Sequence, residues 1–161
     1  MENISNALVY EDADLFLFME EMKILFPIHY DELCETKEFP LDPDYDSYMQ
    51  LCNANMIKCI TCRMDGELIG YATFIIKPHL HYKSWKTAFE DIYFIKKEFR
   101  KKHIGIGLLQ YSEGVLKSIG VNRVIMHTKV HMDNSGLFEY LGYRITDKIF
   151  TKILDLTTEV I

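Results

Sequence analysis

"EFRKKHIGIGLLQYSEGVL", residues 98–116, decides the fold, because it carries a basic turn directly into an amphipathic helix. Three consecutive cations, Arg100 to Lys102, precede Gly105 and Gly107. The first amides of a helix have no partner within it, and the helix dipole favours negative charge there. The turn therefore predicts a phosphate-binding site, at which the two glycines would let a ligand come close to the backbone. A purely structural role for the glycines, a tight turn and close helix packing, stays open.

The chain on both sides of this stretch alternates between strand and helix patterns. Asp14 and Asp42 are suitable N-caps, and the pair Asp65–Gly66 suits a two-residue hairpin turn. The strand-helix-strand passage through residues 87–130 favours parallel pairing across a helix. The fold class is therefore α/β (α+β), with a central mixed, mostly antiparallel twisted sheet of about six to seven strands flanked by about four helices. The expected strands cover residues 7–11, 57–64, 67–76, 87–95, 121–130 and 143–154, and the expected helices cover residues 15–26, 43–52, 104–119 and 134–141.

Length and composition indicate one globular unit. The 161 residues suffice for one domain and are few for two, so residues 1–161 are expected to form a single domain. The content of 48% hydrophobic and 26% charged residues is typical of a soluble protein, and no apolar run is long enough to span a membrane. The first residues lack the basic and apolar segments of a signal peptide, which favours a cytoplasmic location and reduced cysteines.

Charge is distributed unevenly over a chain whose net charge is −6. Residues 96–103 carry five cations and one acid, whereas residues 31–46 carry seven acids and one cation. A solvated surface is the simpler explanation for either cluster. A basic pocket beside an acidic surface would suit one anionic and one cationic ligand, and it disfavours duplex nucleic acid as the main partner.

Two longer stretches carry a family resemblance: "IYFIKKEFRKKHIGIGLLQYSEGVLKSIGVNRVIMHTKV", residues 92–130, and "NSGLFEYLGY", residues 134–143. They resemble the coenzyme A binding half of the GCN5-related N-acetyltransferase (GNAT) family, with its Arg/Gln-x-x-Gly-x-Gly/Ala loop. Residues 39–51 and 77–95 resemble a subset of this family that bacteriophages often carry. The resemblance implies the GNAT fold, acetyl-CoA as co-substrate, and transfer of an acetyl group to a primary amine of a small molecule or peptide.

The resemblance also assigns cofactor contacts. Arg100 takes the first place of the loop, His103 stands where the family has its first glycine, and Gly105 takes the second. Histidine adopts positive φ more readily than most residues, but its side chain occupies room that the family leaves empty. Backbone groups of Phe94 and Ile95 are expected to bind the pantetheine arm. Further contacts are expected from Asn134 and from the pyrophosphate-binding amides of Lys101, Lys102, His103, Ile104, Gly105 and Ile106.

The expected reaction needs a base. In this family an amine attacks the thioester directly, and deprotonating an alkylammonium with a pKa near 10.4 costs roughly 4.6 kcal/mol at about pH 7. Side chains alternate on the expected strand 87–95, so only one of Glu90 and Asp91 can face the site. Asp91 is the favoured general base and Glu90 the alternate, with a capping or ion-paired acid as the structural explanation for either.

The usual acid for the leaving group is missing. The family commonly places a tyrosine four residues before a glycine, and Phe138 stands at that position. Tyr140 is the remaining candidate, although helical geometry turns it to a different side. A thiolate with a pKa near 8.5 needs little protonation, so the loss is tolerable. A catalytically weak coenzyme A sensor or interaction module is the alternative function.

The acceptor site is expected beside the acidic residues 31–46. The candidate acceptor-site residues are His29, Asp42, Asp44, His79, His81, His127 and Lys129. No metal is expected, because the histidines lack a partner pair at a recognised spacing and Lys129 would lie among them. Cys59 and Cys62 are an odd number apart on an expected strand, so they should point to opposite faces as ordinary structural residues.

A third functional hypothesis is a nucleic-acid-modifying acyltransferase, in which Lys96 to Lys102 contact backbone phosphates. Steeply salt-dependent binding of DNA or RNA would favour it. The sequence leaves open the identity of the amine, the preferred acyl chain and the oligomeric state, a homodimer included.

Overall fold

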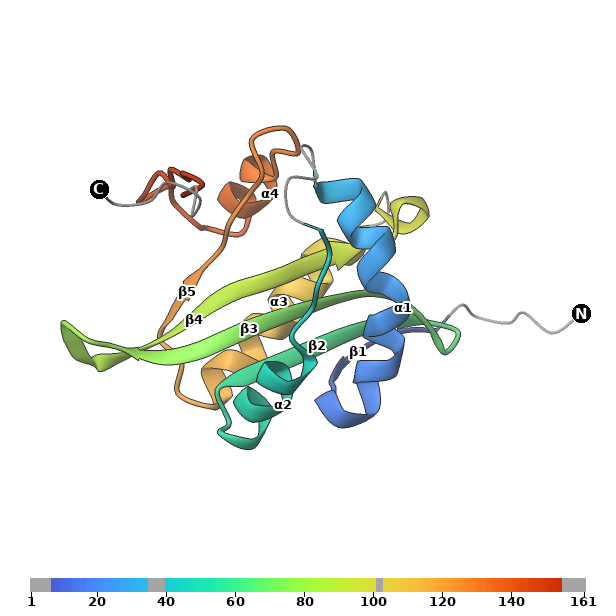
Figure 1. The fold of residues 1–161 in the computed structure, drawn as a ribbon, viewed down its shortest axis with the longest axis horizontal. Helices are drawn as coiled ribbons and strands as arrows, with labels where there is room; N and C mark the ends of the chain where they lie inside the picture. The colour runs from blue at the N-terminus through green and yellow to red at the C-terminus, as the bar shows by residue number, and fades with distance from the viewer. Residues whose placement is uncertain (1–6, 35–39, 101–102, 155–161) are drawn as a thin grey trace, which may run out of the picture.

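A five-stranded sheet lies at the centre of the structure, a computed structural model that describes residues 7–34, 40–100 and 103–154 (Figure 1). Its strands are β1 (Leu8–Asp12), β2 (Ile57–Met64), β3 (Glu67–His79), β4 (Tyr82–Ile95) and β5 (Arg123–Ile125). They lie side by side in chain order. The first four pair antiparallel, and β5 pairs in parallel with β4, as the crossover through a helix predicts.

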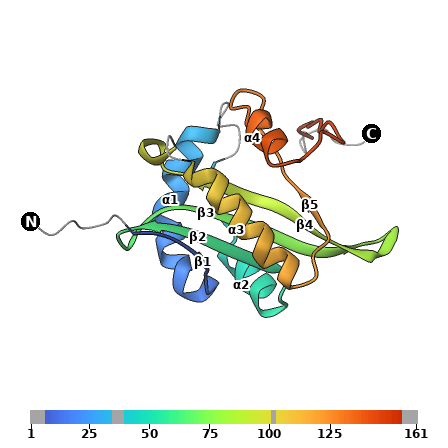
Figure 2. The same cartoon turned by 180° about the vertical axis from the view of Figure 1, so that it is seen from behind.

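Helices cover both faces of this sheet. The α-helices of the described residues are α1 (Leu15–Leu33), α2 (Tyr45–Asn53), α3 (Ile104–Ser118) and α4 (Ser135–Tyr140). α1 and α2 lie on one face, and α3 crosses the other, which Figure 2 shows from behind. Each face buries its own apolar cluster, and Phe138 of α4 joins the cluster under α3. Cys59 and Cys62 fall into different clusters, which confirms that they point to opposite faces.

The helix ends differ from the sequence prediction in two places. Asp14 caps α1 as expected, accepting the Phe16 N–H at 2.9 Å, but the helix passes through Pro27 and ends seven residues later than predicted. Pro27 lies on the exposed side, where a missing backbone N–H is tolerated because water can satisfy the carbonyl that loses its partner. α2 is capped by Asp44 and not by Asp42, since the Asp44 carboxylate accepts the Ser47 N–H at 2.9 Å.

Two hairpins shape the sheet. At the first turn, Asp65 and Gly66 both have positive φ, 51° and 85°, as the predicted two-residue turn requires. Residues 77–86, expected to form a loop, instead extend β3 and β4 into a long second hairpin that reaches beyond the sheet (Figure 1). Pro78 fits there because β3 has passed its last β2 pair, so the missing N–H breaks no ladder bond.

The sheet has fewer strands than predicted. Of the expected strand 121–130, only Arg123–Ile125 pairs with the sheet, and residues 143–154 form no strand in the part of the chain that the structure describes. Alternation of apolar and polar side chains indicates a strand, but a strand also needs a neighbouring backbone to pair with. Neither segment has such a neighbour along its full length. No described helix combines the length and the hydropathy that crossing a membrane requires.

Candidate active site

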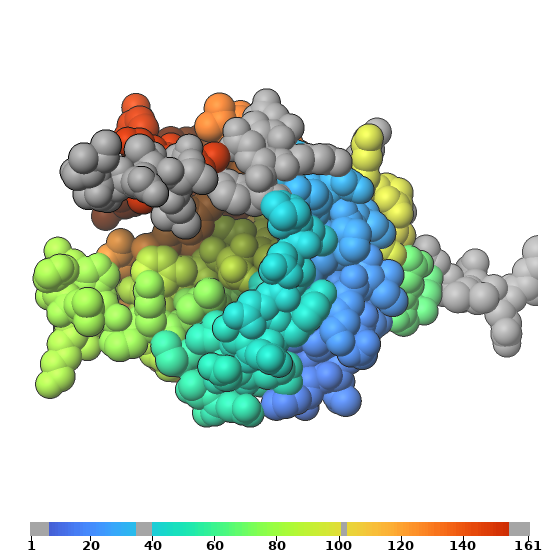
Figure 3. Space-filling view, in the orientation of Figure 1, coloured from blue at the N-terminus to red at the C-terminus, as the bar shows by residue number. Residues whose placement is uncertain are grey.

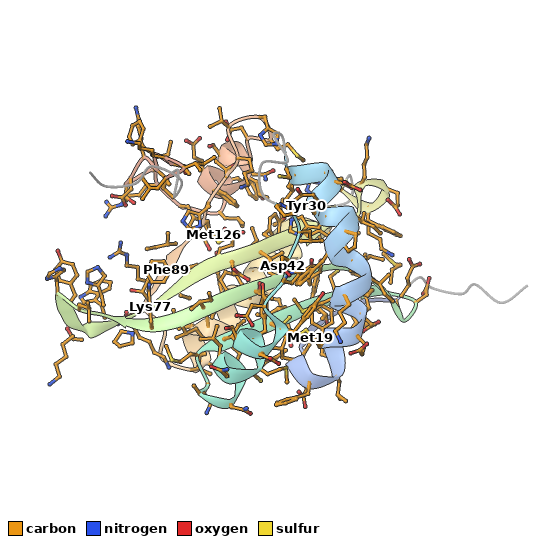
Figure 4. All side chains as sticks on the ribbon, viewed as in Figure 1. Met19, Tyr30, Asp42, Lys77, Phe89 and Met126 are labelled. Carbon is orange, nitrogen blue, oxygen red and sulfur yellow. The ribbon has the colours of Figure 1, made fainter. Side chains whose placement is uncertain are left out.

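β4 and β5 form a fork. They pair only between Thr87–Phe89 and Arg123–Ile125, and beyond Phe89 the described chain offers β4 no strand partner on that side. A cavity of about 870 Å³ opens there, between the C-terminal half of α1, the segment before α2 and the residues that follow β5. Figure 3 shows this hollow over β4, and Figure 4 labels two residues of its wall, Tyr30 and Asp42.

Two carboxylates line the cavity beside a β-bulge in β4. Thr73 of β3 pairs with Ile92, but the next residue, Phe74, pairs with Glu90, so Asp91 is an extra residue in β4. Strict alternation would point Asp91 to the face opposite Glu90. Alternation in fact holds between these two residues, because Glu90 pairs with Phe74 of the cluster under α3, whereas Asp91 is bonded to Tyr48 of α2 on the opposite face. Both acids nevertheless line the cavity, because the cavity lies at the edge of β4 that β5 leaves open. The expectation that only one of them can face the site was therefore wrong.

Two hydroxyl groups hold Asp91 in place. Tyr48 of α2 donates to its Oδ2 at 2.7 Å, and the buried Thr73 donates to the same oxygen at 3.2 Å. Burial, together with the neighbouring Asp91 carboxylate, raises the pKa of Tyr48, so the phenol stays protonated and remains a donor. Asp91 is exposed to the cavity and yet fixed in orientation.

Glu90 occupies the fork itself. Its Oε2 accepts the His127 backbone N–H at 3.1 Å and lies 3.2 Å from the His127 Nδ1. The Glu90 side chain is only 11% exposed, and this burial raises its pKa despite the opposing effect of the His127 contacts. A carboxylate with a raised pKa accepts a proton more readily near neutral pH, which suits a general base.

His29 of α1 forms an uncharged part of the wall. Its ring stacks on Phe94 with the centroids 4.8 Å apart, and its Nδ1 lies 3.3 Å from the Tyr71 hydroxyl. Burial, helped by the charges of Arg100 and Lys129, lowers the pKa of His29 to about 4. The imidazole is therefore neutral at physiological pH and leaves the charge of the nearby carboxylates unbalanced.

Most of the predicted acceptor-site residues meet at this cavity. Asp44 contributes although it also caps α2, and the hydrogen bonds from Ser47 lower the pKa of its carboxyl group. Among the described lining residues, four carboxylates stand against one lysine, so the wall attracts a cation. The predicted residues found there are His29, Asp42, Asp44, Glu90, Asp91, His127, Lys129 and Asn134.

Other predicted residues lie elsewhere. His79 and His81 flank the turn of the β3–β4 hairpin, with their rings 5.7 Å apart, and Tyr140 is 74% exposed on α4. None of the three is among the residues that line the cavity. Lys101 and Lys102 lie outside the described residues. Within the described ranges, no three His, Cys, Asp or Glu side chains are grouped closely enough to hold a metal ion.

The turn before α3 has the backbone that the sequence predicts. His103 adopts the left-handed conformation, with φ 56° and ψ 11°, at the N-cap position. The first bond of the helix ladder runs from the Gly107 N–H to the His103 carbonyl at 3.1 Å. Three earlier amides have no acceptor inside the helix and can bind an anion: those of Ile104, Gly105 and Ile106.

Arg100 is anchored to the protein beside this turn. Its Nε donates to the Ile95 carbonyl at 2.8 Å, and its guanidinium pairs with Glu32 of α1. The same guanidinium lies 5.8 Å from the ring centre of Phe94. The positive charge is therefore fixed at the end of β4, on the strand edge that β5 does not cover, where it occupies the Ile95 carbonyl.

The glycines of the turn serve helix packing. A Cβ on Gly105 would collide with the Tyr93 hydroxyl, and a Cβ on Gly107 would collide with the Tyr10 hydroxyl. Tyr10 of β1 also donates to the Ile104 carbonyl at 3.1 Å. In both glycines, the side on which a Cβ would lie faces the sheet. The expectation that this side admits a ligand was therefore wrong. The structural role that the sequence left open is the one observed.

Sequence reasoning missed the residues that support the acids. Tyr48 was expected only as an apolar residue of a helix, and Thr73 as a residue inside a strand. Nothing in their local sequence signals a contact with Asp91, which lies 43 and 18 residues away, respectively. Three aromatic residues of the cavity wall, Tyr30, Tyr48 and Tyr93, were also not predicted as site residues.

Comparison with known proteins identifies the class. Residues 23–143 match the model of the acetyltransferase (GNAT) family. The chain belongs to this family and is a GNAT-type acyltransferase, as the resemblance of its sequence implied. A comparison with curated protein sequences found no match. The bacteriophage-associated subset finds no support in these comparisons.

Similar solved structures agree on the fold. A transcriptional regulator from Bacillus halodurans has a TM-score of 0.73 and 18% identity, with 92% of this chain and 100% of that chain covered. A predicted acetyltransferase with acetyl-CoA from Clostridium acetobutylicum has a TM-score of 0.69 and 16% identity, covering 91% and 96%. Glucosamine-6-phosphate N-acetyltransferase from Arabidopsis thaliana has a TM-score of 0.68 and 15% identity, covering 92% and 99%.

Proposed function

We propose that the protein transfers an acetyl group from acetyl-CoA to a primary amine, on a small molecule or a peptide, by direct attack of the amine. The observation that carries the proposal is the fork beside β4, where Glu90 and Asp91 line the same cavity. Supporting it, one similar structure contains acetyl-CoA, and another is named for acetylating glucosamine 6-phosphate, whose nitrogen is a primary amine.

The residues around the fork fit the thioester co-substrate. The free amides of Ile104, Gly105 and Ile106 would hold its diphosphate, beside the charge of Arg100. Backbone groups of Phe94 and Ile95, on the strand edge that β5 does not cover, would pair with its pantetheine arm once the Arg100 Nε leaves the Ile95 carbonyl. Asn134 lines the cavity on the other side of the fork. Bound there, acetyl-CoA supplies an acyl group on a thiolate that leaves without needing a strong acid.

The two acids have different tasks. Asp91, exposed and fixed by Tyr48 and Thr73, attracts and orients the incoming ammonium group. Sequence reasoning favoured Asp91 as the base, but the raised pKa of the buried Glu90 makes Glu90 the better proton acceptor. Asp42 and Asp44 add negative charge to the same cavity. A cytoplasmic location, a single domain over residues 1–161 and a homodimer remain predictions from the sequence.

The test is release of free thiol from acetyl-CoA with a panel of primary amines, joined to mass measurement of the acetylated amine. We expect turnover with at least one cationic amine and a large loss in both Glu90→Gln and Asp91→Asn. Cofactor binding by calorimetry without thiol release for any amine would contradict the proposal and favour a coenzyme A sensor. Unchanged turnover in Asp91→Asn would remove Asp91 from the mechanism.

A further inference from the structure

A second pocket lies at the base of the β3–β4 hairpin, at the other end of β4. It has a volume of about 350 Å³ and shares no lining residue with the active-site cavity. Residues 76–87 contain three lysines and neither aspartate nor glutamate, in a chain whose net charge is −6. This hairpin pocket is lined by Asn55, Met56, Ile76, Lys77, Pro78, Lys83, Ser84, Trp85 and Lys86.

The lysines of the hairpin pocket carry unneutralised charge in defined positions. The Lys86 Nζ donates to the Ile119 carbonyl at 2.8 Å, and the Lys77 Nζ lies 4.5 Å from the ring centre of Phe89, which Figure 4 labels beside it. Both contacts fix an ammonium group without cancelling its charge. Across the described ranges, Lys77, Lys83 and Lys86 form no ion pair with a carboxylate. Lys86 points to the α3 face of the hairpin and Lys77 to the opposite face, on which alternation along β4 also places Lys83 and Trp85. Two cations on one face attract an anion.

The pocket also offers an aromatic surface. Trp85 is 48% exposed, although burial of an indole is favourable and this is the one tryptophan of the chain. Its half-open ring can stack on a planar heterocycle, and such stacking contributes about 1 to 3 kcal/mol when the partner is a nucleobase. Asn55, which also lines the pocket, carries an amide that can both donate to and accept from a base edge.

We propose that the hairpin pocket binds a nucleotide, with the phosphate on Lys77 and Lys83 and the base on Trp85. The ligand is either a free nucleotide or the end of a single-stranded nucleic acid, since the two present the same phosphate and base. The volume of the pocket is at the lower end of the range for small-molecule sites. The inference does not depend on acetyl transfer, because no residue of the active site takes part in it.

Trp85 makes the test direct, because intrinsic tryptophan fluorescence reports this pocket alone. The protein is titrated with AMP, adenosine, inorganic phosphate and a short oligodeoxyadenylate. We expect saturable quenching by AMP that weakens with added salt, and weaker effects of adenosine and phosphate alone. Tighter binding of the oligonucleotide than of AMP would assign a nucleic acid end as the ligand, and equal or weaker binding would assign a free nucleotide.

A matched pair of variants supplies the control. Lys83→Glu should weaken AMP binding by about tenfold or more, because it replaces an attractive charge with a repulsive one. Lys117→Glu makes the same change on the exposed face of α3 and should alter binding by less than about twofold. Equal losses in the two variants, absence of saturable quenching, or phosphate binding as tightly as AMP would each overturn the proposal. An unchanged midpoint of urea unfolding for Lys83→Glu verifies that this variant is folded.

Discussion

Toward its C-terminal end, β4 presents Glu90 and Asp91 to a cavity whose described lining holds four carboxylates and one lysine. Toward its N-terminal end, the same strand gives Lys83, Trp85 and Lys86 to a pocket whose described lining holds no carboxylate at all. Both ends of β4 contain a register shift against β3, but only the acidic end also lies at a fork, where β5 stops pairing with β4. One strand can therefore carry a site for a cation and a site for an anion, because side-chain chemistry and local backbone geometry change along its length.

The largest expected effect comes from removing the base at the acidic end. Glu90→Gln keeps the shape of the side chain but cannot accept a proton, so kcat should fall by about a hundredfold or more. The measurement is thiol release at saturating acetyl-CoA and amine. A matched Glu113→Gln change, at a carboxylate that accepts the Tyr143 hydroxyl far from the cavity lining, should leave kcat nearly unchanged. Similar losses in both variants would break the distinction between the two ends.

Stability should depend on pH through His29 at the acidic end. The unfolded chain binds a proton at this residue below about pH 6.5, whereas the folded protein accepts it only near pH 4. The free energy of unfolding should therefore rise with pH between these values, by up to about 3 kcal/mol from His29, and stay level above them. Denaturant unfolding at several pH values measures this slope. His29→Phe should flatten it, and an equally steep slope in that variant would refute the assignment.

Packing of α3 against the sheet gives the next effect. Gly107→Ala should destabilise the fold by about 1 to 3 kcal/mol, because the added methyl group meets the Tyr10 hydroxyl. Gly114→Ala, in the same helix with nothing within 4 Å of its added Cβ, should instead stabilise by roughly 0.5 to 1 kcal/mol. The midpoints of urea unfolding compare the two. Destabilisation of equal size in both would show that the glycines matter for another reason.

A smaller effect is expected from the support of Asp91. Tyr48→Phe removes one of the two hydroxyl donors and leaves the ring, so kcat/KM should fall by about fivefold to tenfold, as the loss of a single hydrogen bond implies. The decrease should appear in KM for a cationic amine more than in kcat, because Asp91 orients the ammonium group. A decrease confined to kcat would instead assign Asp91 to proton transfer.

The smallest expected effect tests, at the basic end of β4, whether the two ends of this strand act independently. Lys83→Glu should change kcat/KM for acetyl transfer by less than about twofold, since Lys83 lines the hairpin pocket and not the active-site cavity. Steady-state thiol release checks this. A large change would mean that the two ends of β4 are coupled, and the description of independent sites would have to be abandoned.

The sequence predicted local features well and tertiary features poorly. The Asp65–Gly66 turn, the Asp14 cap and the left-handed His103 follow from the preferences of individual residues, and all are observed. The joint presence of Glu90 and Asp91 at one cavity was not predicted, because it depends on where β5 stops pairing with β4, and the sequence does not show that an open strand edge lets both faces border one cavity.

The lack of tertiary information in local sequence also explains the wrong predictions for other parts of the chain. Alternating residues 143–154 predicted a strand, but alternation does not say whether a partner edge exists. Residues 77–86 were expected to be the loop between two strands, but they continue both strands, and β3 tolerates Pro78 because it has passed its last partner in β2. His79 and His81 were consequently placed near the acceptor, and they lie at the tip of the hairpin.

The dependence of kcat/KM on pH, measured for the wild type and for Glu90→Gln, tests the central claim most directly. Burial raises the pKa of Glu90, so the wild type should lose activity on acidification at a higher pH than an ordinary glutamate would impose. In Glu90→Gln this acidic limb should disappear along with most of the rate. A variant that keeps both the limb and the rate of the wild type would contradict the assignment of the fork as the catalytic site.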